Sequence, residues 1–246
     1  MNIENKEKQN INEISDPYPI WIIDNFFNES VLSKIKKEWP SLDSNLWHKG
    51  HAYINNKKNI LEQGMRGISK IEDIPTFTSD VLKYIHSDDF TQRISDITGI
   101  NDLITDESMR WSGLRTMVPG SFQAIHSDAR KNPESGFRKE LTCLVYLNDE
   151  YDENRDKGSF EVWNDDMTEC VHKINPINNR LVIFLNTDKS YHGVPEVNFE
   201  RRAILWSILK DAESEDRSKA LFVSRPEDSD EISKLGKERA FIKDVM

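Results

Sequence analysis

The chain has 246 residues, 37% hydrophobic and 31% charged, a balance that supports one domain with a sizeable core under a charged surface. Its net charge of −10 disfavours nucleic acid as a partner, because phosphate binding requires a basic face. No apolar run approaches the length of a membrane span and no signal peptide is recognisable, so we expect a cytoplasmic protein with no membrane partner.

The N-terminal part of the sequence predicts a tail, a strand and a helix. Residues 1–15 are polar and charged and are expected to form a disordered tail. A short apolar strand is predicted at 19–24. The segment 29–39 has the apolar spacing of an amphipathic helix, with Asn28 as its cap and Pro40 as its stop.

Residues 41–72 carry a weaker pattern than the segments on either side. We expect a short strand and turn around His48 and His51, and a mobile polar loop over 55–66. Both histidines are candidates to face a functional site. The apolar spacing over 75–97 then predicts two helices.

The second half of the sequence alternates short apolar strands with turn residues and has no intervening helices, which is typical of a sandwich or barrel. Eight strands are predicted, at about 112–118, 121–128, 141–148, 159–164, 169–175, 180–186, 190–197 and 201–210. The expected fold class is therefore mainly β with flanking helices (α+β): a jelly-roll core with the N-terminal helices packed outside. Cys143 and Cys170 fall in two of these strands and are expected to be free thiols.

The sequence is expected to form a single domain over residues 16–246. It divides into a helical flank, a jelly-roll core and a charged C-terminal extension, at residues 16–108, 109–210 and 211–246. Within the extension, 218–223 predicts an edge strand and 230–245 predicts a helix. The sequence gives no indication of the oligomeric state.

Two histidines and one carboxylate in the core form a candidate ligand set for a divalent metal. His126 and Asp128 are two residues apart, so on a strand their side chains point to one face. With His192 they match the 2-His-1-carboxylate set of non-haem Fe(II) oxygenases, which leaves coordination positions open. Each residue alone is a weak signal, and the ordered set carries the prediction. His86 and His172 lack such a context and are expected at the surface.

The motifs around this set resemble those of the 2-oxoglutarate/Fe(II)-dependent dioxygenases, in the branch similar to prolyl hydroxylases. The shared motifs are His-x-Asp at 126–128, Tyr-Leu-Asn at 146–148, His-Gly-Val-Pro at 192–195 and Arg-x-Ala-Ile at 201–204. The resemblance covers roughly residues 110–210. It implies a double-stranded β-helix, which is a jelly roll, with Fe(II), 2-oxoglutarate and O2 as cofactor and cosubstrates. It also implies hydroxylation of an unactivated C–H bond with release of succinate and CO2.

The resemblance further assigns residues to the cosubstrate. Arg201 is expected to pair with the distal carboxylate of 2-oxoglutarate, because a guanidinium fork binds a carboxylate through two hydrogen bonds. Arg202, on the other strand face, is the alternative. Tyr146 matches a family position whose hydroxyl reaches the same carboxylate, and Thr142 lies four residues earlier on the same face. Ordinary packing inside the barrel is the alternative for Tyr146.

The substrate is a small molecule or a peptide that the sequence does not identify: a prolyl residue, a free amino acid and a sugar or other metabolite are all open. Arg115 precedes the metal pair on its own strand, and we expect it to orient an anionic group of the substrate. A structural ion pair is the alternative. Trp163 is a candidate wall of the site or a core tryptophan. Two other functions stay open: a metal oxygenase that does not use 2-oxoglutarate, and a non-catalytic jelly-roll binding module.

Overall fold

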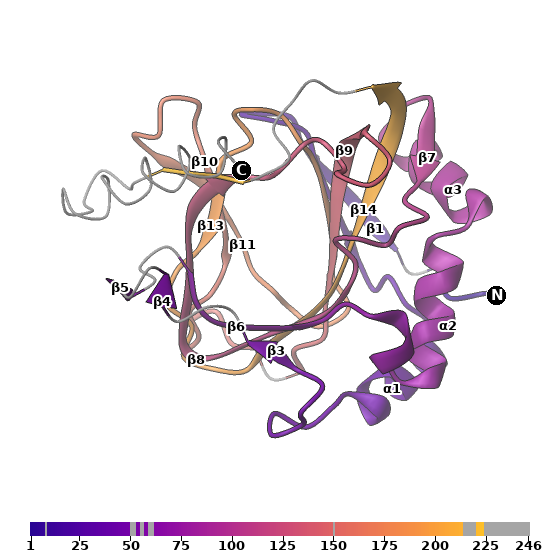
Figure 1. Cartoon of the computed structure of the whole chain (residues 1–246), viewed down its shortest axis with the longest axis horizontal. Coiled ribbons are helices and arrows are strands. Elements are labelled where there is room, and N and C mark those ends of the chain that lie inside the picture. Colours follow the sequence, from indigo (N-terminus) through magenta and orange to yellow (C-terminus); the bar gives the residue numbers. More distant parts are fainter. Residues whose placement is uncertain are drawn as a thin grey trace.

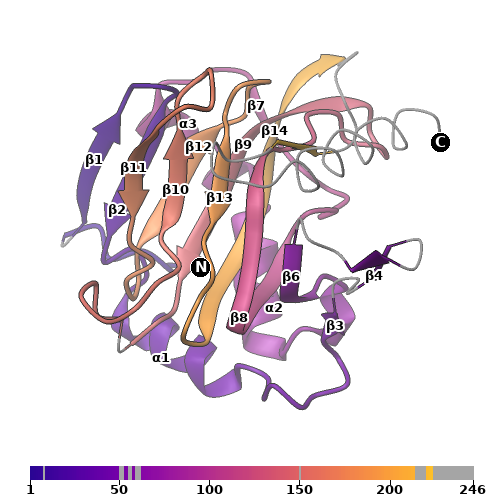
Figure 2. The ribbon, with the colours of Figure 1, turned by 90° about the vertical axis from the view of Figure 1, so that its left-hand side faces the viewer.

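The computed structural model describes residues 1–7, 9–49, 53–54, 57–58, 62–149, 151–213 and 220–223. In this part of the chain most strands join one antiparallel sheet that curls on itself, so the architecture is mainly β and jelly-roll-like (Figure 1). The sheet runs, in spatial order, through β1 (Asn10–Ile14), β2 (Ile20–Asp24), β12 (Leu181–Leu185), β9 (Phe137–Tyr146), β14 (Arg201–Glu213), β8 (Gly113–Ser127), β13 (His192–Val194), β10 (Phe160–Trp163) and β11 (Cys170–Ile174). Figure 2 shows the wall made of β8, β13, β10 and β11.

Three α-helices lie beside the opposite wall, which contains β9 and β14 (Figure 1). They are α1 (Glu29–Glu38), α2 (Thr76–Ile85) and α3 (Asp88–Thr98), close to the predicted segments. The side chain of Asn28 caps α1 by accepting a hydrogen bond from the backbone N–H of Val31 (3.0 Å), and α3 ends at Gly99, whose φ is +70°. None of the described helices is long and apolar enough to cross a membrane.

Strands β9 and β14 are buried on both faces, because alternate side chains join two different core clusters. Cys143 of β9 and Ile204 of β14 pack in the cluster that contains the buried helix residues. Tyr146 and Ala203, on the same two strands, pack in a second cluster inside the curl. Both Cys143 and Cys170 are free thiols, as predicted. In the middle of this wall, alternate residues therefore pack toward the helices or toward the interior of the curl.

Strand β8 corrects one prediction. The sequence predicted strands at 112–118 and 121–128 with a turn at Pro119 and Gly120, whereas the structure has one strand over Gly113–Ser127. The chain changes partner here instead of reversing: the first half of β8 pairs with β14 and the second half with β13. Gly120 has a φ of +85°, where glycine is favoured. The other six predicted strands are present with bounds shifted by a few residues.

The N-terminal segment holds a strand where a disordered tail was expected. Residues 10–14 form β1, which pairs in register with β2, and Ile3 is buried. The prediction of a disordered tail is wrong for these residues. The side chains of β1 are mostly exposed, so the sequence shows no apolar pattern there, and backbone pairing with β2 holds the strand in the sheet.

The described part of the chain also contains short elements. They are β3 (His48–Lys49), β4 (Tyr53–Ile54), β5 (Lys57–Lys58), β6 (Glu62–Ile68), η1 (Ile71–Asp73), β7 (Leu103–Thr105) and β15 (Leu221–Phe222). Of these, β3, β6, β7 and β15 join the main sheet, while β4 and β5 pair with each other. Because β6 pairs along β8, the mobile loop expected over 55–66 is wrong from residue 62 onward. The pairing of β15 with β8 confirms a strand within 218–223. His48 is exposed, whereas His51 and the helix expected over 230–245 lie outside the described residues.

His86, expected at the surface, is half-buried where α2 ends. Its Nε2 lies 2.8 Å from the Oγ of Ser112, and burial lowers the pKa of its imidazole to about 4. The prediction failed because the turn between α2 and α3 folds back onto the start of β8. His172 is also half-buried, although its Nε2 lies 3.0 Å from the carbonyl oxygen of Asp16 in a contact open to solvent.

Candidate metal centre and its cavity

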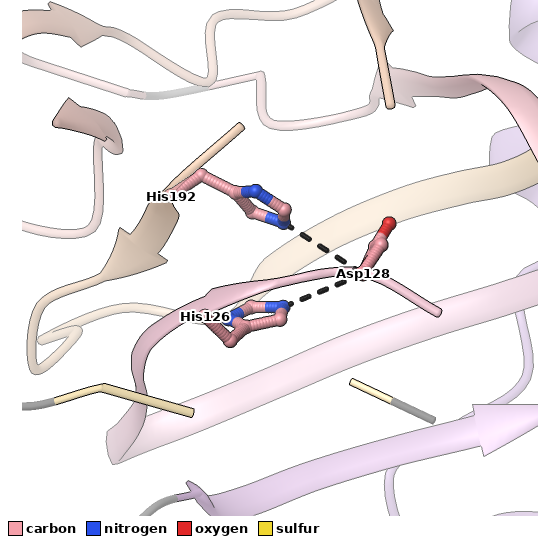
Figure 3. Close-up of side chains that lie close together, drawn as sticks. All are labelled: His126, Asp128 and His192. Carbon is pink, nitrogen blue, oxygen red and sulfur yellow. Dashed lines mark ion pairs between the residues drawn. The ribbon is translucent and has the colours of Figure 1, made fainter. Parts of the chain in front are cut away.

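His126, Asp128 and His192 converge inside the curl (Figure 3). His126 lies near the end of β8, and His192 begins β13 directly opposite it in the register of the two strands. Asp128 follows the last residue of β8, one position beyond the strand on which it was predicted. The Nε2 atoms of His126 and His192 lie 3.6 and 3.9 Å from Asp128 Oδ1, and one ligand atom from each residue falls within 4.8 Å of the others.

Both imidazoles are oriented with Nε2 toward the convergence point. The Nδ1 atoms of His126 and His192 lie 2.9 and 2.8 Å from the backbone carbonyl oxygens of Ala124 and Ser190. A carbonyl only accepts, so each Nδ1 carries the proton and each Nε2 keeps its lone pair. Burial lowers the pKa of His192 to about 3. These donors fit a divalent metal, which requires neutral imidazoles.

Asp128 divides its two carboxylate oxygens between different partners. Oδ1 faces the histidines, whereas Oδ2 accepts hydrogen bonds from Lys139 Nζ (2.7 Å) and Thr142 Oγ1 (3.0 Å). Burial raises the pKa of this carboxyl, but its polar neighbours, with the charge of Lys139 foremost, hold it well below its usual range. Asp128 is therefore ionised at neutral pH and able to serve as a ligand.

A cavity of about 370 Å³ opens on these three side chains, within the range of small-molecule sites. Its walls come from β6, β8, β9, β10, β12, β13, β14 and β15. Apolar side chains dominate the lining, and the histidine rings pack against aromatic neighbours. Phe160 stacks on His192 with ring centroids 5.2 Å apart, and Phe222 stacks on His126 at 5.1 Å. Aromatic rings thus flank both histidines of the candidate metal centre.

Arg201 enters the same cavity from the first residue of β14. It is buried, and its Nε donates to the carbonyl oxygen of Gly158 (2.9 Å) while one terminal nitrogen donates to the hydroxyl of Tyr146 (3.1 Å). Among the described residues, no carboxylate lies within 4.0 Å of its guanidinium. A buried guanidinium without a carboxylate partner is electrostatically unfavourable, and a bound carboxylate would compensate its charge. Tyr146 lies behind Arg201, with its ring 4.8 Å from the guanidinium carbon.

Three other residues that the sequence analysis considered for the site lie in different surroundings. Arg202, the alternative to Arg201, is half-buried and pairs with Glu200 at 2.8 Å, away from the cavity. Thr142 lines the cavity, but its hydroxyl contacts Asp128 rather than Arg201 or Tyr146. Trp163 is buried outside the residues that line the cavity, so the structure favours the core interpretation of this side chain.

Arg115 also lines the cavity, on the half of β8 that pairs with β14. Its guanidinium donates to the carbonyl oxygens of Leu114 (2.9 Å), Trp111 (3.3 Å) and Ser112 (3.5 Å). Burial lowers its pKa to about 10, which leaves it charged at neutral pH. No carboxylate of the described part of the chain lies within 4.0 Å of it, so the structural ion pair considered for Arg115 is not present there.

Lys139 is a site residue that the sequence reasoning missed. The predicted strand began at 141, and alternation back from Thr142 would point residue 140 inward. The structure has a register shift at this point: Ile208 pairs with Leu141, but Leu209 pairs with Lys139. This bulge skips Glu140 and turns Lys139 into the cavity, where its Nζ lies 5.0 Å from the ring centroid of Trp111. No motif in the sequence marks such a shift.

Comparison with known proteins agrees with this geometry. Residues 112–207 match the family model of the 2OG-Fe(II) oxygenase superfamily, a stretch that contains both histidines, Asp128 and Arg201. Among curated proteins, no sequence matches the chain significantly.

Similar folds occur among solved prolyl hydroxylases. The enzyme of Trichoplax adhaerens, in complex with a hypoxia inducible factor peptide, has a TM-score of 0.59 and 20% identity, over 79% of this chain and 84% of that one. The prolyl-4-hydroxylase of Pseudomonas putida has a TM-score of 0.58 and 14% identity, over 78% and 93%. A prolyl 4-hydroxylase of Phytophthora capsici has a TM-score of 0.53 and 19% identity, over 92% and 68%. At these identities the likeness describes the fold.

Proposed function

We propose, from the match of residues 112–207 to the 2OG-Fe(II) oxygenase superfamily, that the protein is a 2-oxoglutarate-dependent hydroxylase of an unactivated C–H bond. When bound, Fe(II) with 2-oxoglutarate and O2 supplies the oxidising chemistry, in which the substrate gains a hydroxyl group and succinate and CO2 are released. His126, Asp128 and His192 are the proposed metal ligands. The protein contributes the open ligand set, the orientation of the reactants and a largely apolar enclosure.

The observation that carries this proposal is the pairing of two features in one cavity. A three-ligand metal centre alone would serve many enzymes. Here the same cavity also holds Arg201, a buried guanidinium with no described carboxylate partner. An acid that chelates the metal at one end and carries a second carboxylate at the other satisfies both features, and 2-oxoglutarate is such an acid. Tyr146 supports the same role by holding Arg201 in place.

The proposal predicts succinate formation that requires three components together. Purified protein given Fe(II), 2-oxoglutarate and O2 should convert 2-oxoglutarate to succinate slowly without substrate and much faster with it. Chromatography of succinate measures this reaction, and omission of Fe(II) or O2 is the control. Oxygen consumption without succinate would instead indicate a metal oxygenase that does not use 2-oxoglutarate. Absence of both would favour a binding module.

The lining of the cavity further supports a substrate that carries an anionic group. Three lining side chains are cationic, Arg115, Lys139 and Arg201, and Asp128 is the one carboxylate among the described lining residues. Lys139 is paired with Asp128, and 2-oxoglutarate would pair with Arg201. This leaves the charge of Arg115 uncompensated, with its guanidinium held in place by backbone carbonyls. A carboxylate or phosphate of the substrate is the proposed partner, as in an acidic amino acid or a phosphorylated metabolite.

Arg115→Ala should therefore separate substrate turnover from cosubstrate turnover. A panel of prolyl peptides, free amino acids and acidic metabolites is tested for stimulation of succinate release. We expect anionic members to stimulate the parent protein, and Arg115→Ala to weaken that stimulation by about 10–100-fold, the range for a lost hydrogen bond to a charged group. Arg110→Ala, which removes an exposed arginine paired with Glu134, is the control.

Basal succinate release without substrate should stay within about twofold of the parent in Arg115→Ala, because Arg115 contacts none of the proposed metal ligands. A loss of basal release equal to the loss of stimulation would mean that Arg115 only supports the strand. Stimulation by neutral peptides that is unchanged in Arg115→Ala would argue against an anionic substrate.

A further inference from the structure

Lys139 is the one lysine or arginine of the described residues whose charge lies within 4.0 Å of the Asp128 carboxylate, and the fold fixes its position closely. Its side chain is 5% exposed, and its Nζ donates to Asp128 Oδ2 at 2.7 Å while lying over the ring of Trp111. Its backbone N–H donates to the carbonyl oxygen of Arg130 at 2.6 Å. Among the described residues, Asp128 is the one carboxylate within 4.0 Å of this ammonium group. Lys139 and Asp128 therefore form a buried pair.

This pair constrains how Asp128 can bind a metal. Oδ2 is taken by two donors, Lys139 and Thr142, and Thr142 is in turn held by the side-chain amide of Asn186 at 3.0 Å. Only Oδ1, which faces both histidines, is left to coordinate. A carboxylate held in this way binds a metal through one oxygen. The coordination position that a chelating carboxylate would take is thereby kept for another ligand.

The pair also sets the charge of the site. Two neutral histidines and one carboxylate would offset one of the two positive charges of a divalent ion. Lys139 cancels the charge of Asp128, so the three ligands and Lys139 together carry no net charge. An ion bound there would retain its full attraction for an anion, and that attraction is stronger beside a largely apolar protein wall than in open water. Lys139 would thus oppose binding of the metal and favour binding of an anionic ligand on the metal.

We propose that Lys139 is a positioning residue that fixes Asp128 as a one-oxygen ligand and leaves a bound divalent ion with the charge that attracts the dianion 2-oxoglutarate. This inference rests on the proposed function and assigns a role to a residue outside the ligand set. It predicts that the two affinities change in opposite directions: loss of the Lys139 ammonium should tighten metal binding and weaken 2-oxoglutarate binding. A residue that merely supports the fold would weaken both.

The test uses Lys139→Met, which keeps most of the length of the side chain without its charge, and calorimetric titration under anaerobic conditions. Mn(II) is titrated first, and 2-oxoglutarate is then titrated into the Mn(II)-loaded protein, so neither measurement depends on turnover. Lys139→Met should bind Mn(II) about tenfold more tightly and 2-oxoglutarate about tenfold more weakly than the parent, as expected for removal of one nearby charge in a partly desolvated site.

Two companion variants separate charge from packing. Lys139→Arg restores a cation and should return both affinities toward those of the parent. Lys189→Met removes an exposed lysine that pairs with Asp165, and it should change neither affinity. If Lys139→Met weakens both ligands, or if Lys139→Arg behaves as Lys139→Met does, the proposal is overturned. If the parent itself binds no Mn(II), it is the proposed metal site that fails. If Lys139→Met does not fold, the Lys139→Arg result decides: affinities far from those of the parent would reject the role.

Discussion

His192→Ala is expected to abolish tight binding of a divalent metal. The substitution removes one of three proposed ligands and leaves His126 and Asp128 too few to hold the ion. Loss of a hydrogen-bond partner of a ligand already costs about 10–100-fold in metal affinity, so loss of the ligand itself should cost at least about 100-fold. Anaerobic titration with Fe(II) or Mn(II) measures the dissociation constant, and succinate release should fall with it.

The same substitution removes a ring that packs against Phe160 and Phe184, so folding has to be checked independently. Thermal unfolding of the metal-free protein serves this purpose. His172→Ala is the matched control, because His172 lies on β11, away from the cavity lining. A folded His192→Ala protein that binds one metal ion as tightly as the parent would remove His192 from the ligand set.

Arg201→Ala is expected to raise the dissociation constant of 2-oxoglutarate while leaving metal affinity nearly unchanged. The distal carboxylate of the cosubstrate would lose its charged partner inside a buried site. Truncating one side of such a pair costs about 2–5 kcal/mol, which is roughly 30-fold to several thousand-fold in affinity. Calorimetric titration of 2-oxoglutarate into the Mn(II)-loaded protein measures this change directly.

Arg202→Ala provides the comparison. Arg202 is adjacent to Arg201 in the sequence, but its guanidinium pairs with Glu200 outside the cavity. The substitution should leave the affinity for 2-oxoglutarate within about twofold of the parent, because this ion pair lies outside the cavity. A large effect of Arg202→Ala combined with a small effect of Arg201→Ala would transfer the role to Arg202. Equal losses in both variants would indicate damage to β14 instead.

The pairing of His126 with Asp128 could be predicted from a local rule, whereas His192 and the choice of Arg201 over Arg202 rested on the order of motifs shared with a known family. A two-residue spacing sets one face of an extended chain, and alternation separates Arg201 from Arg202. Those rules need only the correct assignment of a strand. They also hold when the strand ends one residue early, as it does before Asp128.

Lys139, β1 and the course of β8 could not be predicted in this way, because each depends on pairing between distant segments. The bulge that turns Lys139 inward exists only in the register of β9 against β14. Strand β1 is held by its neighbour β2 rather than by its own apolar side chains. The exchange of partners along β8 at Pro119 and Gly120 is likewise a property of the assembled sheet.

The two sides of the cavity differ in how freely their residues can be exchanged. On β9 and β14, adjacent residues such as Val145 and Tyr146 belong to two separate core clusters, so a library of variants there would lose folded members at nearly every position. Met65 on β6 is only half-buried, and it touches the cavity from a short strand that pairs with β8. An effort to evolve acceptance of new substrates would start at this position.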